Sequence, residues 1–197
     1  KPKKTKKRGY EMASSVEICN KALQLLGTSK PLTSLADDTK AGRACNRVYD
    51  PIRLLMLQGH PWNFAMKRSS LPALVEVPAW GFALSYQVPS DALFVKEINS
   101  TDEWKIEGDK INTDEVAPLG VLYMQNIEDP DLMTPLFREA LSARVAVDIA
   151  YDLTGNATLL TNLKAIYDER LSGARTNDAQ EGTPDAVEQG AWLDSRI

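Results

Sequence analysis

Apolar side chains recur every three to four residues in two segments of the first third of the chain, the pattern of amphipathic helices. The first helix is predicted over residues 14–26, where Ser14 and Glu17 can form a capping box. The second is predicted over residues 38–59. Pro51 is expected to kink it, because proline lacks the amide hydrogen of a helical hydrogen bond.

The pattern changes in the middle of the chain, where prolines separate short runs of β-forming residues. These runs predict a β-rich insertion over residues 80–127. Gly108-Asp109 separates two of them, and glycine at the first central position favours a two-residue type II′ hairpin turn. In that hairpin, Ile106 and Ile111 are expected to lie on one face.

Helical spacing returns over residues 135–153 and 158–174. In the first of these segments, apolar residues surround much of the helix circumference. A stripe that wide implies burial on more than one side, either at the centre of a bundle or between subunits. Four residues are therefore candidates for a subunit interface: Val145, Val147, Ile149 and Tyr151.

Two helices, a β-rich insertion and two further helices predict an α+β fold. We expect a bundle of about four helices with a central insertion of hairpins, formed as a single domain by residues 12–177. Extended arms are predicted at both ends: a basic arm over residues 1–11 and a tail over residues 178–197.

The formal net charge of −4 conceals an uneven distribution. Residues 1–11 carry six basic side chains and one acidic side chain, whereas residues 12–197 carry 17 basic and 26 acidic ones, a net charge of −9. The arm is expected either to bind nucleic acid or an acidic partner surface, or to lie outside a natural domain that starts at Met12. Neither a membrane span nor a secretory signal is expected, since no apolar run approaches roughly 20 residues.

The stretch 60–68, HPWNFAMKR, contains the only histidine of the chain. Pro61 prevents continuation of the preceding helix, and Trp62 and Phe64 offer a large apolar area for burial. We interpret Pro61, Trp62 and Phe64 as a structural joint between the helices and the insertion; an aromatic contact with a neighbouring subunit is the alternative. A catalytic role for His60 is disfavoured, because its neighbours indicate a packed turn.

The sequence contains no motif typical of nucleotide binding, nucleophilic hydrolysis or zinc proteases. The available carboxylate pairs, Asp37-Asp38 and Asp129 with Asp131, precede predicted helices, where acids complement the helix dipole without a metal. We therefore expect no enzyme activity, no catalytic residue, no cofactor and no metal. Two thiols without metal-ligand spacing are expected to be reduced core residues rather than a disulfide: Cys19 and Cys45.

Several segments, in a fixed order and spacing, carry a family resemblance. They are ALQLLG with SLADDTKAGRACNRVYDPIR, HPWNFAMKRSSL, YQVPSDALFVKEI, WKIEGDKINTD, LYMQNIEDPDLMTPLFREALSARVAVDIAYDLTG and AQEGTPDAVEQGAWLDSR. Together they span residues 12–196, and none of them is a catalytic signature. In this order the chain resembles the head-to-tail adaptors of short-tailed bacteriophages, the tail tubular protein A family, and related prophage connector proteins.

The resemblance implies a structural protein of the virion, located at the head-tail junction and assembled in the host cytoplasm. It implies a ring, expected to be dodecameric, that docks beneath the portal protein and receives the distal tail tube or nozzle. Double-stranded DNA would pass through the ring without sequence-specific binding, and the free protein can be a monomer. An acidic body suits such a channel, since like charge prevents sticking.

The acidic tail at residues 178–197 lacks a helical or strand period, yet it contains an aromatic anchor. We predict that it docks onto the portal or an adjacent subunit through Trp192, Leu193 and Arg196. Two other functions stay open: a tail-associated hydrolase that uses a carboxylate pair, and a DNA-binding accessory protein that uses the basic arm.

Overall fold

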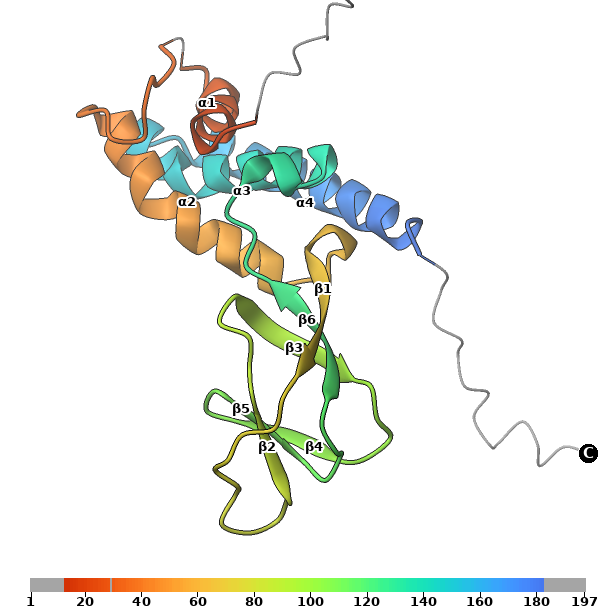
Figure 1. Ribbon diagram of the computed structural model, residues 1–197. Coiled ribbons are helices and arrows are strands. Elements are labelled where there is room, and N and C mark those ends of the chain that lie inside the picture. Colours follow the sequence, from red (N-terminus) through yellow and green to blue (C-terminus); the bar gives the residue numbers. More distant parts are fainter. Residues whose placement is uncertain (1–12, 29, 183–197) are drawn as a thin grey trace, which may run out of the picture.

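The computed structural model describes residues 13–28 and 30–182 (Figure 1). These residues form four α-helices and two three-stranded antiparallel sheets, which confirms the predicted α+β fold. Figure 1 shows the helices gathered in the upper part of the molecule and the sheets below them. The body is therefore elongated, with a helical part and a β part.

The helical part consists of α1 (Ser15–Leu25), α2 (Lys40–Gln58), α3 (Pro135–Thr154) and α4 (Ala157–Ala179). Side chains that bind the first free amide groups fix the helix starts: Ser14 caps α1, as the sequence predicts, and Thr134 caps α3. At the start of α2, Thr39 accepts a hydrogen bond from the amide of Gly42 at 2.9 Å. Only glycine fits at position 42, because a Cβ there would lie 2.3 Å from the carbonyl oxygen of Asp37.

Helix α3 is the centre of the bundle and packs against α1, α2 and α4. Most of its wide apolar circumference is therefore covered by three helices of its own chain. Burial of this kind contributes about 1.5–3 kcal/mol for each large aliphatic side chain. Gly155, with a φ of 64°, ends α3 in the left-handed conformation that favours glycine.

The β part begins earlier than the sequence predicts. One sheet has the order β1 (Met66–Leu71), β6 (Leu119–Gln125) and β3 (Ala92–Ile98), and the other has the order β2 (Leu84–Gln87), β5 (Lys110–Thr113) and β4 (Trp104–Glu107). The predicted start at residue 80 is wrong, because it leaves out β1. That strand is mostly polar, so it has no apolar alternation to reveal it.

The predicted hairpin is confirmed. Strands β4 and β5 pair with Ile106 opposite Ile111, and only the two residues Gly108 and Asp109 separate them. Gly108 has a φ of 64° and Asp109 has no positive φ, as a type II′ turn requires. Behind this sheet lies a second apolar core, which includes Tyr86, Ile111, Leu119, Val121 and Tyr123.

The chain passes between the two parts through neighbouring strands. It leaves α2 through the short 3₁₀ helix η1 (Asn63–Ala65) into β1, and it returns from β6 through η2 (Pro130–Leu132) into α3. Strands β1 and β6 pair in register from Met66 opposite Met124 to Leu71 opposite Leu119. The strand that enters the β part, β1, thus pairs with the strand that leaves it, β6.

Helix α4 is longer than predicted, and this corrects the start of the C-terminal tail. The sequence pattern ends the helix at residue 174 and begins the tail at residue 178, but α4 continues to Ala179. Its last turn is held by contacts of Asp178 with residues far away in the sequence, which periodicity cannot reveal. The basic arm and the docking candidates Trp192, Leu193 and Arg196 lie outside the described residues.

Candidate functional site

The predicted joint is built around a buried indole. Trp62 is 1% exposed, and its ring lies 4.9 Å from that of Phe137 at an interplanar angle of 76°. Its Nε1–H donates a hydrogen bond of 2.8 Å to the carbonyl oxygen of Met56, one of the last helical residues of α2. The tryptophan therefore connects the end of α2 to the first turns of α3, with its polar atom satisfied.

The neighbours of Trp62 extend this aromatic cluster in both directions. His60 lies edge-on to the indole with ring centroids 4.6 Å apart, and Phe64 lies 5.1 Å from Phe137. Pro61 is exposed and follows the end of α2, where its missing amide hydrogen is not needed. The stretch thus turns the chain from α2 into η1 and β1 while its rings pack into the helical core.

Sequence reasoning missed Asp178, which holds α4 against this joint (the clamp). Its side chain is 6% exposed, Oδ1 accepts from the amide of Asn63 at 2.8 Å, and Oδ2 lies 3.0 Å from Nε2 of His60. The side chain of Asn63 also donates to the carbonyl oxygen of Asp178 at 2.7 Å. A buried carboxylate with these partners fixes the last turn of α4 on the α2–β1 connection.

Three of the four predicted subunit-interface residues are core residues. Val145 and Ile149 are fully buried and Val147 is 6% exposed, all within the chain's own helical core. Their side chains are not available to another subunit in this fold, which corrects the prediction for them. Tyr151 is different: it is 65% exposed and can contact a neighbour.

Large apolar side chains stay exposed on both parts of the molecule. Trp80 and Val75 stand out, at 88% and 102% exposure, in the loop between β1 and β2. Isolated exposed apolar residues are common, but a solvated tryptophan and valine on one loop are typical of a contact surface. The other exposed members are Leu55, Leu132, Leu136 and Tyr151 on the helical side and Val77, Ile106 and Val116 on the β side.

The carboxylate pairs have local structural partners. Asp37 accepts from the amide of Thr33 at 2.8 Å, and this bond holds the pKa of Asp37 below its ordinary value. Asp38 forms an exposed ion pair with Arg43. Asp129 accepts from the amide of Asp131 at 3.0 Å and so caps η2. Within residues 13–28 and 30–182, no group of three or more His, Cys, Asp or Glu residues is arranged to hold a metal ion.

Both cysteines are free and buried in the helical core, as predicted. A hydrogen bond with Cys45, together with burial, raises the pKa of the Cys19 thiol. A thiol held protonated in an apolar core is a poor nucleophile. Cys19 therefore contributes packing rather than reactivity.

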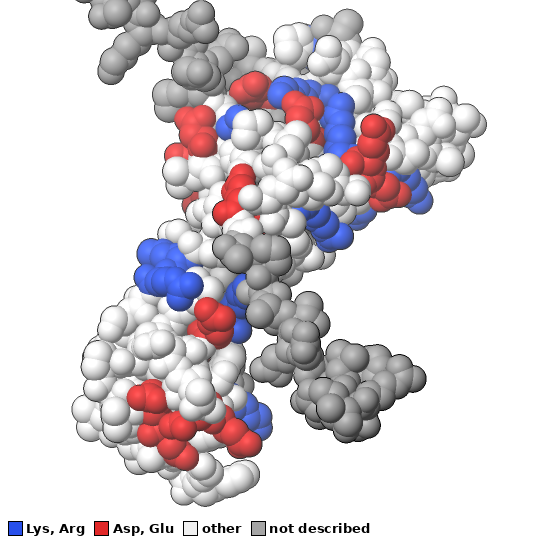
Figure 2. Space-filling view, turned by 90° about the vertical axis from the view of Figure 1, so that its right-hand side faces the viewer, with Lys and Arg blue, Asp and Glu red and all other residues white. Residues whose placement is uncertain are grey.

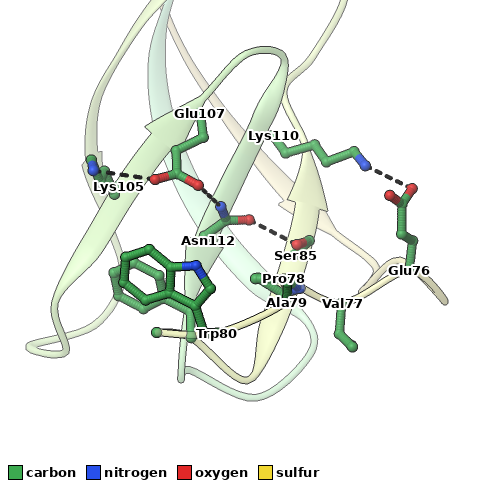
Figure 3. Close-up of a pocket in the computed structure, with 12 residues that line it drawn as sticks. Glu76, Val77, Pro78, Ala79, Trp80, Ser85, Lys105, Glu107, Lys110 and Asn112 are labelled. Atoms are coloured by element: carbon green, nitrogen blue, oxygen red, sulfur yellow. Dashed lines mark hydrogen bonds and ion pairs between the residues drawn. The ribbon is translucent and has the colours of Figure 1, made fainter.

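A hollow of about 480 Å³ lies over the β2–β5–β4 sheet, between the strands and residues 76–82 (Figure 3). The sheet register places alternate residues of each strand on its floor, among them Ser85, Asn112, Lys105, Glu107 and Lys110. Trp80 belongs to its wall. We call this feature the sheet-face hollow; its volume lies in the range of about 300–1,000 Å³ typical of small-ligand sites.

Acidic side chains prevail on the β part. Residues 66–125 contain nine acidic and five basic residues, and Figure 2 shows a gathering of acidic side chains on the lower part of the visible face. Over the helical part of that face, acidic and basic groups are mixed. Such a surface repels polyanions at distances within the screening length of about 8–10 Å.

No helix in the described part of the chain has the length and apolar character needed to cross a membrane. Comparison of the chain with protein-family models gives no match, and comparison with curated proteins gives no significant match either. The family resemblance therefore rests on the order of the chain's own segments.

Proposed function

We propose that this protein is a structural head-to-tail adaptor of a tailed phage. It forms a ring, most simply a dodecamer, beneath the portal protein, extends the DNA channel and receives the distal tail tube or nozzle protein. The observation that carries the proposal is the placement of exposed large apolar side chains on both parts of an elongated body. This agrees with the segment order that resembles the tail tubular protein A family.

An adaptor has to make contacts at two levels and also with its own copies. Tyr151, Leu136 and Leu132 offer apolar contact area on the helical side, and Val75 and Val77 offer it on the β side. Each is exposed while the chain is alone, and each becomes buried when a partner covers it. Large apolar groups at the centre of an interface supply most of its binding energy.

The charge of the body supports the channel role. Acidic side chains outnumber basic ones on the β part, as they do over residues 12–197 as a whole. Double-stranded DNA carries about one negative charge per 1.7 Å of its axis, so a lumen lined by carboxylates does not retain it. The DNA would pass through the ring without sequence-specific binding.

The C-terminal segment supplies a further contact in this proposal. Residues 183–197 follow α4 and contain Trp192, Leu193 and Arg196, which can anchor the segment on the portal or on the next subunit. The protein would act in the virion at the head-tail junction and be assembled in the host cytoplasm. The free chain would be a monomer that forms the ring only on the portal.

Mixing the purified chain with isolated portal rings tests this function. Light scattering after size-exclusion chromatography should give a monomer mass for the free chain and a complex for the mixture. Electron microscopy should then show added density of rotational symmetry on one face of the portal. A mixture that elutes as two separate species, over a range of salt and protein concentrations, would contradict the adaptor function.

A further inference from the structure

The charges of the sheet-face hollow cancel within it. Lys105 Nζ lies 3.2 Å from Oε1 of Glu107, and Lys110 Nζ donates to Oε2 of Glu76 at 2.7 Å. Each ammonium group therefore has its own carboxylate, and the lining offers no excess of either sign. A phosphate or a cationic ligand would have to break one of these pairs, so the hollow favours a neutral ligand.

The floor of the hollow presents hydrogen-bond donors and acceptors in fixed positions. Ser85 and Asn112 are 2% and 4% exposed, and the Ser85 hydroxyl donates to Oδ1 of Asn112 at 2.7 Å. The Asn112 amide donates in turn to Oε2 of Glu107 at 3.0 Å. A carboxylate has about four acceptor positions and an ammonium group three donors. Glu107 and Lys105 thus keep free acceptor and donor positions within the lining.

One wall of the hollow is a flat apolar surface. The indole of Trp80 is 88% exposed, although it belongs to the lining. Figure 3 shows Trp80 on the same side of the hollow as Lys105 and Glu107, with the Lys110–Glu76 pair on the other side. Gly81, with a φ of 92°, allows the loop to turn directly after the indole. An aromatic face thus lies beside oriented polar groups.

From these three properties we propose that the sheet-face hollow binds a neutral saccharide. A pyranose ring has an apolar face of C–H groups that can lie against Trp80. Its hydroxyls both donate and accept, so they can donate to Glu107 and accept from Lys105. This binding function goes beyond the adaptor function and does not depend on it.

A proline-rich peptide is the closest competitor, since such peptides also bind aromatic grooves. Its backbone offers carbonyl acceptors and almost no donors, because proline lacks an amide hydrogen. The free acceptor positions of Glu107 would then be covered without a partner, which is unfavourable. A saccharide satisfies both kinds of group.

Nuclear magnetic resonance of the indole N–H groups in the full chain tests the proposal. The probes are the methyl α-pyranosides of glucose, galactose and mannose, N-acetylglucosamine, and decaproline as the peptide comparator. At least one saccharide should shift the Trp80 signal saturably, with a dissociation constant on the order of 1 mM, while the buried Trp62 signal stays in place. The Trp80 signal is assigned as the one missing from Trp80→Phe.

Three variants make the result specific. In saturation-transfer difference spectra of the saccharide protons, which do not need the Trp80 signal, Trp80→Ala and Glu107→Gln should each weaken saccharide binding about tenfold or more. Val75→Ala, which changes a fully exposed neighbour outside the lining, should not change it. If Trp80→Ala does not fold, Glu107→Gln decides. The proposal is overturned if no saccharide shifts Trp80 up to about 50 mM, if decaproline alone shifts it, or if folded Trp80→Ala and Glu107→Gln variants bind as well as the natural chain. Portal binding is not measured here, so either proposal can fail without the other.

Discussion

Nε2 of His60 lies 3.0 Å from Oδ2 of Asp178, across 118 residues of sequence. The chain's only histidine thus binds the last turn of its last described helix. The same carboxylate accepts from the amide of Asn63, so one buried side chain closes the contact between α4 and the start of the β part. Replacing Asp178 therefore measures how much of the stability of the fold depends on this contact.

Asp178→Ala should lower the free energy of unfolding by about 1–3 kcal/mol, because the amide of Asn63 loses its partner in a buried place. Urea denaturation at pH 7 measures the change. Asp168→Ala, on an exposed position of the same helix, is the matched control and should leave the unfolding midpoint in place. Equal midpoints for both variants would show that the clamp contributes nothing to stability.

Trp62→Ala and Trp80→Ala should have opposite outcomes although the substitution is the same. Trp62 is 1% exposed and packed on Phe137, so its loss should cost about 3–5 kcal/mol. Trp80 is 88% exposed, and its loss should change stability by less than about 0.5 kcal/mol. Thermal unfolding of the two proteins side by side decides; an unchanged midpoint for Trp62→Ala would contradict the structural joint.

Two substitutions on α3 separate folding from assembly. Val147→Asp places a carboxylate in the helical core and should prevent folding, because an unpaired buried charge costs several kcal/mol. Tyr151→Asp changes an exposed position and should give a folded monomer that joins portal rings poorly. Circular dichroism followed by portal binding checks both variants. A folded Val147→Asp variant would show that this part of α3 is not core.

Protonation of Asp91 in acid should lower the stability of the protein. Burial alone would raise the pKa of Asp91, but hydrogen bonds from Lys67 and Tyr123 outweigh it and hold the pKa below the ordinary value of 3.8. A depressed pKa in the folded state stabilises the protein above pH 3.8, and this contribution disappears as the pH falls through the folded-state pKa. The thermal midpoint of the natural chain should therefore decrease as the pH falls below 3.8.

Asp91→Asn removes this titration. The variant should lose about 1 kcal/mol at neutral pH, a modest amount because the ion pair with Lys67 is partly exposed. Its thermal midpoint should then fall less steeply below pH 3.8 than that of the natural chain. Asp102→Asn, an exposed position, should follow the natural curve. If the thermal midpoints of all three proteins fell equally steeply below pH 3.8, Asp91 would not be the source of the acid instability.

Truncation after Gly182 tests the C-terminal contact. The shortened chain should remain a stable monomer, because every described contact of α4 lies before the cut. It should bind portal rings at least about tenfold more weakly, since the anchor residues Trp192 and Leu193 are gone. Sedimentation of mixtures with portal measures this. Undiminished binding would assign the portal contact to the described body instead.

Local chemistry made much of this fold predictable. The periodicity that buries one face of α1 and α2, the Thr134 cap and the Gly108 turn all depend on residues within one or two turns of each other. Strand β1 was not predicted, because its sequence, MKRSSL, is polar where it faces solvent. Its pairing with β6 joins residues more than 45 positions apart, which no local pattern encodes.

The features of the candidate site also divide into those that local sequence predicts and those that depend on distant contacts. Burial of Trp62 follows from its apolar size, but its contact with Phe137 and the clamp by Asp178 arise only when distant helices pack. The wide apolar stripe of α3 was compatible with a bundle centre or a subunit contact, and three surrounding helices decide for the first. The sheet-face hollow needs the register of three strands and a loop, so sequence alone could not reveal it.

The pairing of β1 with β6 makes the β part a module whose two ends lie together. Because Met66 stands opposite Met124, the two ends of the module emerge next to each other from the helical part. Directly opposed backbone positions in such a ladder are only about 4.5–5.5 Å apart. The strand ends at this junction stay with the helices, because Met66, Leu93, Phe94 and Met124 pack in or against the helical core, whereas no residue of the β2–β5–β4 sheet does. Arg53 of α2 stabilises this junction by donating to the carbonyl oxygen of Ile127 at 2.7 Å. The distal sheet could therefore change without a change in the helical base.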